Sequence, residues 1–235
     1  MFTWEITVQV GWLDNRFFPP PTVVLQTLFE LMFNGELFDH LSASLQRISL
    51  GFVLGAVPGI GLGMLMGWFR IVRAFFDPII SALYPIPKIA LLPLLLIIFG
   101  LGETTRVVIV AMPVFFLSLI TTMQGVKGLD PILLQAGQNF GATGWKLFIK
   151  IILPATLPAI FTGLRLSLGV ALIVIVAAEF VAADTGIGYL IWSSWSVFLV
   201  DQMYAGLVVI AFLGLLFTNG LEYIGRRLMP WAQEI

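Results

Sequence analysis

The sequence predicts an all-α integral membrane protein with about five full transmembrane helices, on three observations. Hydrophobic residues occupy 59% of the 235 positions and charged residues only 11%, whereas a soluble domain carries about 25% charged residues. The mean hydropathy is +1.02. Apolar segments near or above the ~20 residues needed to cross a bilayer recur along the chain. Backbone groups in lipid must pair within their own segment, so residues 1–235 are expected to form one helical membrane domain.

The start of the chain is expected to lie outside the full spans. Residues 1–12 are too short to cross a bilayer, and they lack the charged start, apolar centre and cleavage site of a signal peptide. Residues 22–37 carry apolar side chains at helical spacing. That spacing predicts a short helix that lies on a surface or packs against the bundle and ends at Asn34-Gly35.

The first full span is predicted at about 41–69 and carries a glycine at every fourth position. This spacing places the glycines along one helix face, where another helix can approach closely. They form either a gliding surface for a moving helix or a site of static helix packing. Pro58 is expected to kink the span, because proline cannot donate a hydrogen bond to the preceding turn. The glycines are Gly51, Gly55, Gly59, Gly63 and Gly67.

A proline pair interrupts the second predicted span, at about 79–99. Pro85 and Pro87 break the helical ladder, and Pro93 is expected to interrupt it again. Broken helices are tolerated at membrane depth only where they face protein or a cavity. Pro85, Pro87 and Lys88 are therefore candidates for a path or gate through the membrane. Lys88 either lines that path, where it would attract an anion, or extends to the cytoplasmic surface.

The rest of the chain contains three more predicted spans and two connections. The connection at 184–201 is expected to be a loop, and its Trp192 and Trp195 suit a membrane interface. The other connection, residues 125–158, is rich in small, amide-bearing and basic residues. The three spans are expected at about 106–123, 159–183 and 203–223.

The 125–158 segment is too long and too polar to be a simple link between spans. It predicts a short helix over Pro131–Phe140, a break at Gly141 and a second helix closed by Pro154. Gly141 would allow a positive-φ turn or a close backbone approach. Such a protrusion suits docking to a soluble partner. The residues expected to carry the contact are Gln135, Ala136, Gly137, Phe140, Gly141 and Pro154.

Lysine and arginine are distributed unevenly between the two ends of the predicted spans. The opposite end has Arg106 at a helix start and otherwise the acidic Glu103, Asp184 and Asp201. Because cytoplasmic loops carry an excess of basic residues, the basic end is expected in the cytoplasm, together with the 125–158 segment and the C-terminus. The basic residues at that end are Arg70, Arg73, Lys127, Lys146, Lys150, Arg226 and Arg227.

Two more ionisable residues lie within the predicted spans, where charge is costly and usually functional. Glu179 lies near the outer end of its span. It would hold an outer gate, pair with a basic residue of a docked protein, or form an ion pair inside the chain. Arg165 lies nearer the inner end of the same span, where it is expected to anchor at the interface or to pair within the bundle.

The sequence excludes several kinds of chemistry. No Gly-xxxx-Gly-Lys sequence followed by Ser or Thr is present, so ATP binding by a phosphate-binding loop is excluded. The chain has no cysteine and a single histidine, His40. Disulfides, thiolate metal sites, histidine metal clusters and histidine-based triads are therefore excluded. No metal or cofactor is expected in this chain.

The 125–158 segment resembles the cytoplasmic loop of ABC-importer membrane subunits. That loop usually contains Glu-Ala-Ala, three residues, Gly, and a Leu-Pro or similar pair further on. Here Gln135-Ala136-Gly137 takes the place of the triplet, Gly141 of the glycine and Leu153-Pro154 of the closing pair. The resemblance extends from about Phe18 to Trp231. Within the family, the chain is similar in pattern to the permeases of the nitrate, sulfonate and taurine importer group. Ala90-Leu91-Leu92-Pro93, Gly100-Leu101-Gly102-Glu103 and Ala178-Glu179 also match the family pattern.

The resemblance implies a type I importer permease-like helical bundle that has no catalytic activity of its own. Two copies would enclose a path for a small solute, such as nitrate, sulfonate, taurine or a related anion. Separate ATPase subunits holding ATP and Mg would dock on the 125–158 segment, and an extracytoplasmic binding protein would deliver the solute. The membrane would be the bacterial plasma (inner) membrane. Residues 1–12 would be the tail of a first helix, and the alternative is an ordinary N-terminus at the membrane interface.

Two other classes of function are weighed against this one. A self-sufficient secondary transporter or channel often shows internal repeats and charged residues at the membrane midplane. The sequence shows no convincing repeat between its halves, and Glu179 lies away from the centre of its span. An intramembrane enzyme would need a nucleophile–base pair or a metal-binding set, and neither is visible.

Overall fold

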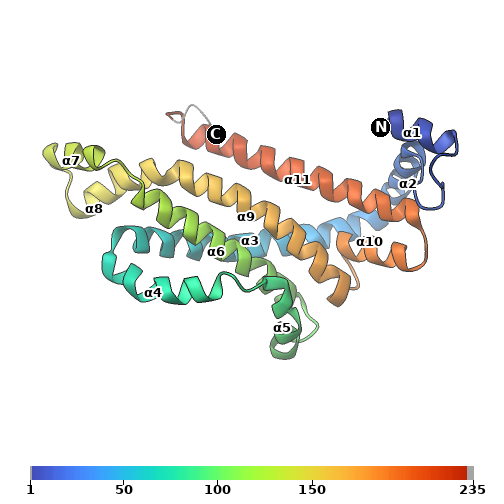
Figure 1. The fold of residues 1–235 in the computed structure, drawn as a ribbon, viewed down its shortest axis with the longest axis horizontal. Helices are drawn as coiled ribbons and strands as arrows, with labels where there is room; N and C mark the ends of the chain where they lie inside the picture. Colours follow the sequence, from blue (N-terminus) through green and yellow to red (C-terminus); the bar gives the residue numbers. More distant parts are fainter. Residues whose placement is uncertain (1, 232–235) are drawn as a thin grey trace.

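The computed structural model describes residues 2–231, which are helical apart from their connections and contain no strand. Four helices are long and apolar enough to cross a membrane, and a bent helix pair would make a fifth span. The expectation of about five spans is therefore confirmed. The four long helices run along the long axis of the molecule (Figure 1): α3 (Glu36–Trp68), α6 (Glu103–Lys127), α9 (Leu153–Ala182) and α11 (Val200–Leu228).

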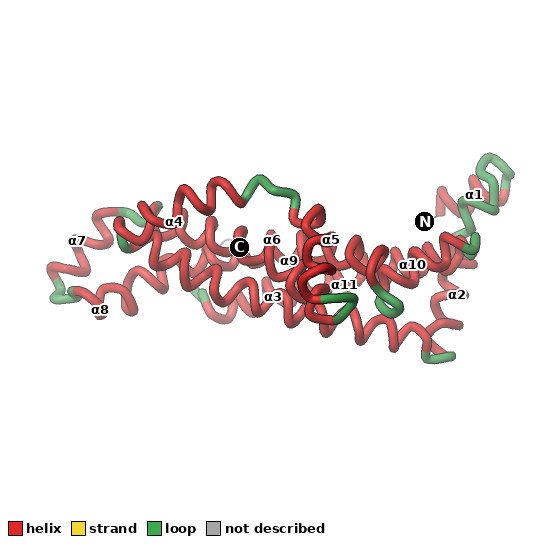
Figure 2. Tube along the Cα trace, turned by 90° about the horizontal axis from the view of Figure 1, so that it is seen from below, coloured by secondary structure: helices red, strands yellow, loops and turns green. Residues whose placement is uncertain are grey.

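Short helices lie at both ends of this bundle. Figure 2 shows α7 and α8 at one end of the long axis and α1 and α2 at the other. The C-terminal end of α11 and the start of α9 lie at the end that holds α7 and α8 (Figure 1). This end is called the inner end below, and the opposite end the outer end. The short helices are α1 (Phe2–Gln9), α2 (Pro21–Phe33), α7 (Pro131–Asn139), α8 (Gly144–Leu147) and α10 (Ile187–Ser196).

The glycine face of α3 is packed directly against α6. A β-carbon added at Gly59 would come within 2.6 Å of the Phe115 carbonyl oxygen. At Gly63 it would lie 2.6 Å from the carbonyl oxygen of Leu119. Contacts this close leave no room for a side chain, and a glycine every fourth residue lets the two backbones meet over most of their length. The geometry favours static packing over a gliding surface.

The second span differs from its predicted form. Helix α4 (Arg70–Leu83) starts directly after Phe69, and a bend of 83° separates it from the segment that contains α5 (Leu92–Phe99). The break at Pro85 and Pro87 is confirmed, since both lie between the two helices. The expected second interruption is wrong: Pro93 lies in the first turn of α5, where its missing N–H has no intrahelical partner to lose.

The 184–201 connection was expected to be a loop, but most of it forms helix α10. Its buried residues Ile187, Leu190, Ile191 and Ser194 recur at three- and four-residue spacing and pack on neighbouring helices. Tertiary packing of this face stabilises a ten-residue helix that propensity alone would not.

A glycine substitution tests the packing of α3 on α6. In Gly59→Ala the new methyl group meets the Phe115 backbone, so we expect a loss of about 1–3 kcal/mol in the stability of the bundle. The measurement is the unfolding midpoint of the purified chain in detergent. Gly61→Ala is the matched control in the same helix, because a β-carbon there meets no atom within 4 Å. Equal effects of the two substitutions would contradict the packing role.

Candidate functional site

The described residues hold three candidate functional features, spread along the long axis. The 125–158 segment protrudes at the inner end, a cleft lies at the broken helix pair, and a buried ion-pair network lies at the outer end. None of these features contains a group of three His, Cys, Asp or Glu side chains placed to hold a metal, nor does any other part of residues 2–231.

In the 125–158 segment, α7 is folded back against the helix that follows it. Its start is fixed by Pro131 in the first turn and by the Asp130 carboxylate, which accepts a hydrogen bond of 2.8 Å from the Ile132 amide. Gly137 is buried against Leu147 and Ile151, so the third residue of the expected triplet is a packing contact. The chain then turns at Gly141, whose φ of +77° agrees with the predicted positive-φ turn.

The outward face of this protrusion is partly apolar. Phe140 is 90% exposed at the tip, and Gln135 and Ala136 are exposed on α7. Trp145, also exposed, stacks on Phe148 with their ring centroids 4.9 Å apart. Ile132, Phe140 and Trp145 are all exposed on this one short segment, and such a group of exposed apolar side chains is typical of a contact surface for another protein.

The protrusion is continuous with the span that follows it. A π-helical turn, Phe148–Ile152, joins α8 to α9, and the helical run Gly144–Ala182 extends over 39 residues. Pro154 was expected to close the segment. It instead occupies the first turn of α9, where proline begins a helix without losing a hydrogen bond.

The cleft lies at the bend between α4 and α5. It has a volume of about 380 Å³ and is lined in part by Pro85, Pro87 and Lys88, so the structure brings three of the predicted path residues together. Aromatic and apolar side chains of α6 and α9, among them Phe116 and Val170, form the opposite wall.

The Lys88 ammonium is turned back onto its own chain. It donates hydrogen bonds of 2.8, 2.9 and 2.8 Å to the carbonyl oxygens of Leu83, Tyr84 and Ile86. These carbonyls have lost their helical partners at the break, so Lys88 pairs backbone groups that lipid could not. The ammonium also lies 4.4 Å from the centre of the Phe116 ring. Its positive charge thus stays at the cleft.

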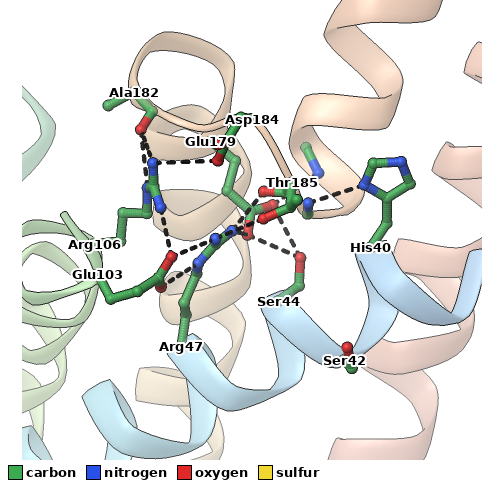
Figure 3. A network of polar contacts seen from close by, with 12 residues as sticks. His40, Ser42, Ser44, Arg47, Glu103, Arg106, Glu179, Ala182, Asp184 and Thr185 are labelled. Carbon is green, nitrogen blue, oxygen red and sulfur yellow. Dashed lines mark hydrogen bonds and ion pairs between the residues drawn. The ribbon is translucent and has the colours of Figure 1, made fainter. Parts of the chain in front are cut away.

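The outer end holds a buried ion pair between Glu179 and Arg47 (Figure 3). The Glu179 side chain is 0% exposed and that of Arg47 1%, with Arg47 Nη1 2.7 Å from Glu179 Oε1. The hydroxyl of Ser44 donates to the same carboxylate at 2.9 Å, and the Gly188 amide donates to it at 2.8 Å. Every oxygen of this carboxylate therefore has partners, as a buried charge requires.

Neighbouring groups extend the network to α6 and α10 (Figure 3). Glu103 accepts hydrogen bonds of 2.7 Å from both Nε and Nη2 of Arg47, and one of 2.5 Å from Arg106 Nη1. Arg106 Nε donates to the Ala182 carbonyl at 2.9 Å. The Gly186 amide donates to His40 Nδ1 at 3.1 Å. The outer ends of α3, α6, α9 and α10 are held together by these contacts.

The contacts of Glu179 and Arg165 distinguish among the roles predicted for these two residues. Glu179 forms an ion pair inside the chain, and its complete burial leaves no surface for a docked protein. Arg165 Nη2 lies 3.6 Å from Glu222 Oε2 of α11, which corresponds to pairing within the bundle. Sequence reasoning missed Arg47 and Ser44. The sequence did contain a signal for Arg47, because an arginine within the first predicted span is as costly in lipid as the carboxylate of Glu179.

Substitutions at the ion pair test its energetic role. Arg47→Met leaves the Glu179 carboxylate buried without its cation, so we expect a loss of about 3–5 kcal/mol in unfolding free energy. The double variant Arg47→Met/Glu179→Gln carries no uncompensated charge and should be more stable than Arg47→Met alone. Denaturant unfolding of the purified chain measures both.

The control is Arg16→Met, because Arg16 pairs with Asp14 at an exposed site, where such pairs contribute about 0–1 kcal/mol. A double variant as unstable as Arg47→Met would show that the buried charge of Glu179 is not the source of the loss.

Comparison with known proteins agrees with this architecture. Residues 59–230 match the family described as "Binding-protein-dependent transport system inner membrane component". The chain is 36% identical to the taurine transport system permease protein TauC of Escherichia coli over 237 aligned positions, which cover 99% of this chain and 86% of that protein.

Two further relatives have related descriptions. The putative aliphatic sulfonates transport permease protein SsuC of Bacillus subtilis is 32% identical over 98% of this chain and 84% of its own length. The nitrate import permease protein NrtB of Leptolyngbya laminosa is 30% identical over 84% of this chain and 71% of its own length. The chain therefore belongs to the family of binding-protein-dependent transport system inner membrane components, with the type I ABC importer permease fold.

Proposed function

We propose that this chain forms half of the path through which an ATP-driven importer moves a small anion, and that the 125–158 segment receives the driving force. Two copies would enclose the path, ATPase subunits holding ATP and Mg would dock at the inner end, and a solute-binding protein would dock at the outer end. The descriptions of TauC, SsuC and NrtB as permease proteins favour this function over a self-sufficient transporter or channel.

The observation that carries the proposal is the helical continuity between the protrusion and α9. The exposed Phe140 lies at the end of α7, and the short turn 141–143 joins it to the helical run Gly144–Ala182, which continues without a break to the outer end. Closure of a partner on this tip would tilt α9 as a unit. The residues proposed to mediate docking are Gln135, Ala136 and Phe140 on the surface, with Gly137, Gly141 and Pro154 shaping the segment.

The distribution of basic residues supports one orientation of the chain. The inner end carries the basic residues identified from the sequence and would face the cytoplasm, together with the C-terminus. The outer end exposes the carboxylates of Glu103 and Asp184. We place the chain in the bacterial inner membrane on the description of its family.

The substrate class follows from the cleft and from the relatives together. The relatives' transport systems are named for taurine, aliphatic sulfonates and nitrate. Each of these solutes carries a sulfonate group or is the nitrate anion. The Lys88 ammonium places a positive charge in a cleft otherwise lined mainly by apolar and aromatic side chains. In such low-dielectric surroundings a fixed cation attracts an anion more strongly than it would in water.

Removing the exposed ring at the tip tests the docking role. Phe140→Ala should weaken association with the ATPase subunits and lower ATP-driven uptake by at least about tenfold, as expected for a central contact residue. Copurification of the ATPase and uptake into proteoliposomes are the measurements. Phe33→Ala is the matched control for copurification of the ATPase, because Phe33 is also 90% exposed but belongs to α2 at the opposite end. If Phe140→Ala and Phe33→Ala behave alike, the docking surface lies elsewhere.

Charge substitutions at the cleft test the path. Lys88→Met removes the cation, so KM for uptake of an anionic solute should rise several-fold, by the ~1–2 kcal/mol of one charge interaction. Lys88→Arg keeps the charge and should retain most of the affinity. Taurine, an alkanesulfonate and nitrate are tested in turn with the assembled transporter. An unchanged KM in Lys88→Met for whichever solute is transported would exclude Lys88 from the path.

A further inference from the structure

An apolar groove runs between α3 and α11 on a side of the bundle away from the cleft. It has a volume of about 290 Å³, and Leu168 of α9 forms its floor. The groove belongs to three membrane-spanning helices, so hydrocarbon surrounds it on the open side. Its walls are formed by Ile48, Ser49, Phe52 and Val53 of α3 and by Leu216, Phe217, Gly220, Leu221 and Ile224 of α11.

The wall formed by α11 is unusually open at Gly220. A β-carbon added there would meet no atom within 4 Å, in contrast to the crowded glycines of α3. Leu216, Gly220 and Ile224 are spaced by four and share one helix face. Glycine at the middle position deepens the groove instead of serving a contact within the chain.

A cation marks the inner end of the same face. Arg227 follows Gly220 by seven residues, which places it on the same side of α11 and about 10 Å nearer the inner end. Its Nη2 donates a hydrogen bond of 2.9 Å to the Tyr223 hydroxyl, and its guanidinium lies 5.2 Å from the centre of the Tyr223 ring. These contacts hold the guanidinium beside Tyr223, beyond the inner end of the groove lining at Ile224.

The neighbouring arginine differs in its partner. Arg226 pairs with the Glu222 carboxylate, and Arg165 also lies within 3.6 Å of Glu222. The described partner of Arg227 is the neutral Tyr223, so its positive charge is not offset there. Inner-leaflet surfaces are negative because of anionic lipids, and each basic residue close to them contributes about 1 kcal/mol of attraction.

We propose that the groove binds one acyl chain of an anionic phospholipid whose phosphate pairs with Arg227. The eleven residues between Leu216 and Arg227 span about 16 Å, near the ~15 Å half-thickness of a bilayer's hydrocarbon core. The apolar lining ends at Ile224, and Arg227 lies about one turn nearer the inner end, so an acyl chain in the groove would place its phosphate beside this cation. The proposal depends on membrane embedding and is independent of the transported solute.

The test uses the complete chain in nanodiscs of phosphatidylcholine that contain a small fraction of phosphatidylglycerol with a photoactivatable acyl chain. Peptide mass spectrometry measures labelling of residues 216–224. Gly220→Leu fills the groove without a clash at its β-carbon, and it should lower labelling at least about fivefold. Arg227→Gln should remove the preference for phosphatidylglycerol over an equally labelled phosphatidylcholine, also about fivefold, the factor of one basic residue near anionic lipid.

Two controls match these variants. Gly61→Leu adds the same side chain at a glycine of α3 that also has no atom within 4 Å of its β-carbon position but does not line the groove. Arg226→Gln removes the same charge from the adjacent position. Both should label like the parent chain.

The parent chain alone also tests the proposal, because its labelling by the two lipids can be compared directly. Equal labelling by phosphatidylglycerol and phosphatidylcholine would overturn the proposal, and so would unchanged labelling in Gly220→Leu. The chain has no cysteine, so Ile224→Cys provides a unique thiol. If Ile224→Cys forms a disulfide-linked dimer in the membrane, a second copy occupies the groove and the lipid proposal fails.

Discussion

One uninterrupted helix, Gly144–Ala182, connects the inner protrusion to the outer ion pair, and the other features depend on it. Its 39 residues extend about 58 Å. A helix surrounded by lipid and protein cannot break at mid-depth without leaving backbone groups unpaired. A displacement applied near Trp145 must therefore reach Glu179. In the proposed function, this constraint would let a partner docked on the short segment at one surface act on the other surface.

The neighbours of this helix decide what moves with it. On one side small residues bring α9 close to α6: a β-carbon at Gly125 would collide with Ala159, and the Ser118 and Ser167 hydroxyls lie 3.3 Å apart. The glycine face of α3 completes the block, and Arg47 ties its outer end to α6 and α9. The place that can yield is the bend at the proline pair, where Lys88 supports the carbonyls left open.

The sequence predicted the features that depend on local rules. The glycine spacing predicted the packed face of α3, the proline pair predicted the broken span, and Gly141 predicted a positive-φ turn. It did not predict features that depend on contacts between distant segments. Arg47 meets Glu179 only after α3 and α9 have packed, and α10 is helical because its buried face has neighbours. The proline errors had a common cause. The predictions placed Pro93 and Pro154 at a break or an end of a helix, whereas both lie in first turns, where proline is favoured.

The most direct test is a distance measured along the continuous helix in the assembled transporter. Because the chain lacks cysteine, spin labels can be placed uniquely with Lys146→Cys beside the protrusion and Val181→Cys at the outer end, where Val181 is 70% exposed. Pulsed electron resonance on assemblies with one labelled copy gives the distance with and without ATP. We expect the distance between the two labels to stay the same with and without ATP, while each label moves relative to a label on α11. A distance between the two labels that changes with ATP would contradict it, because the helix would then absorb the displacement instead of transmitting it.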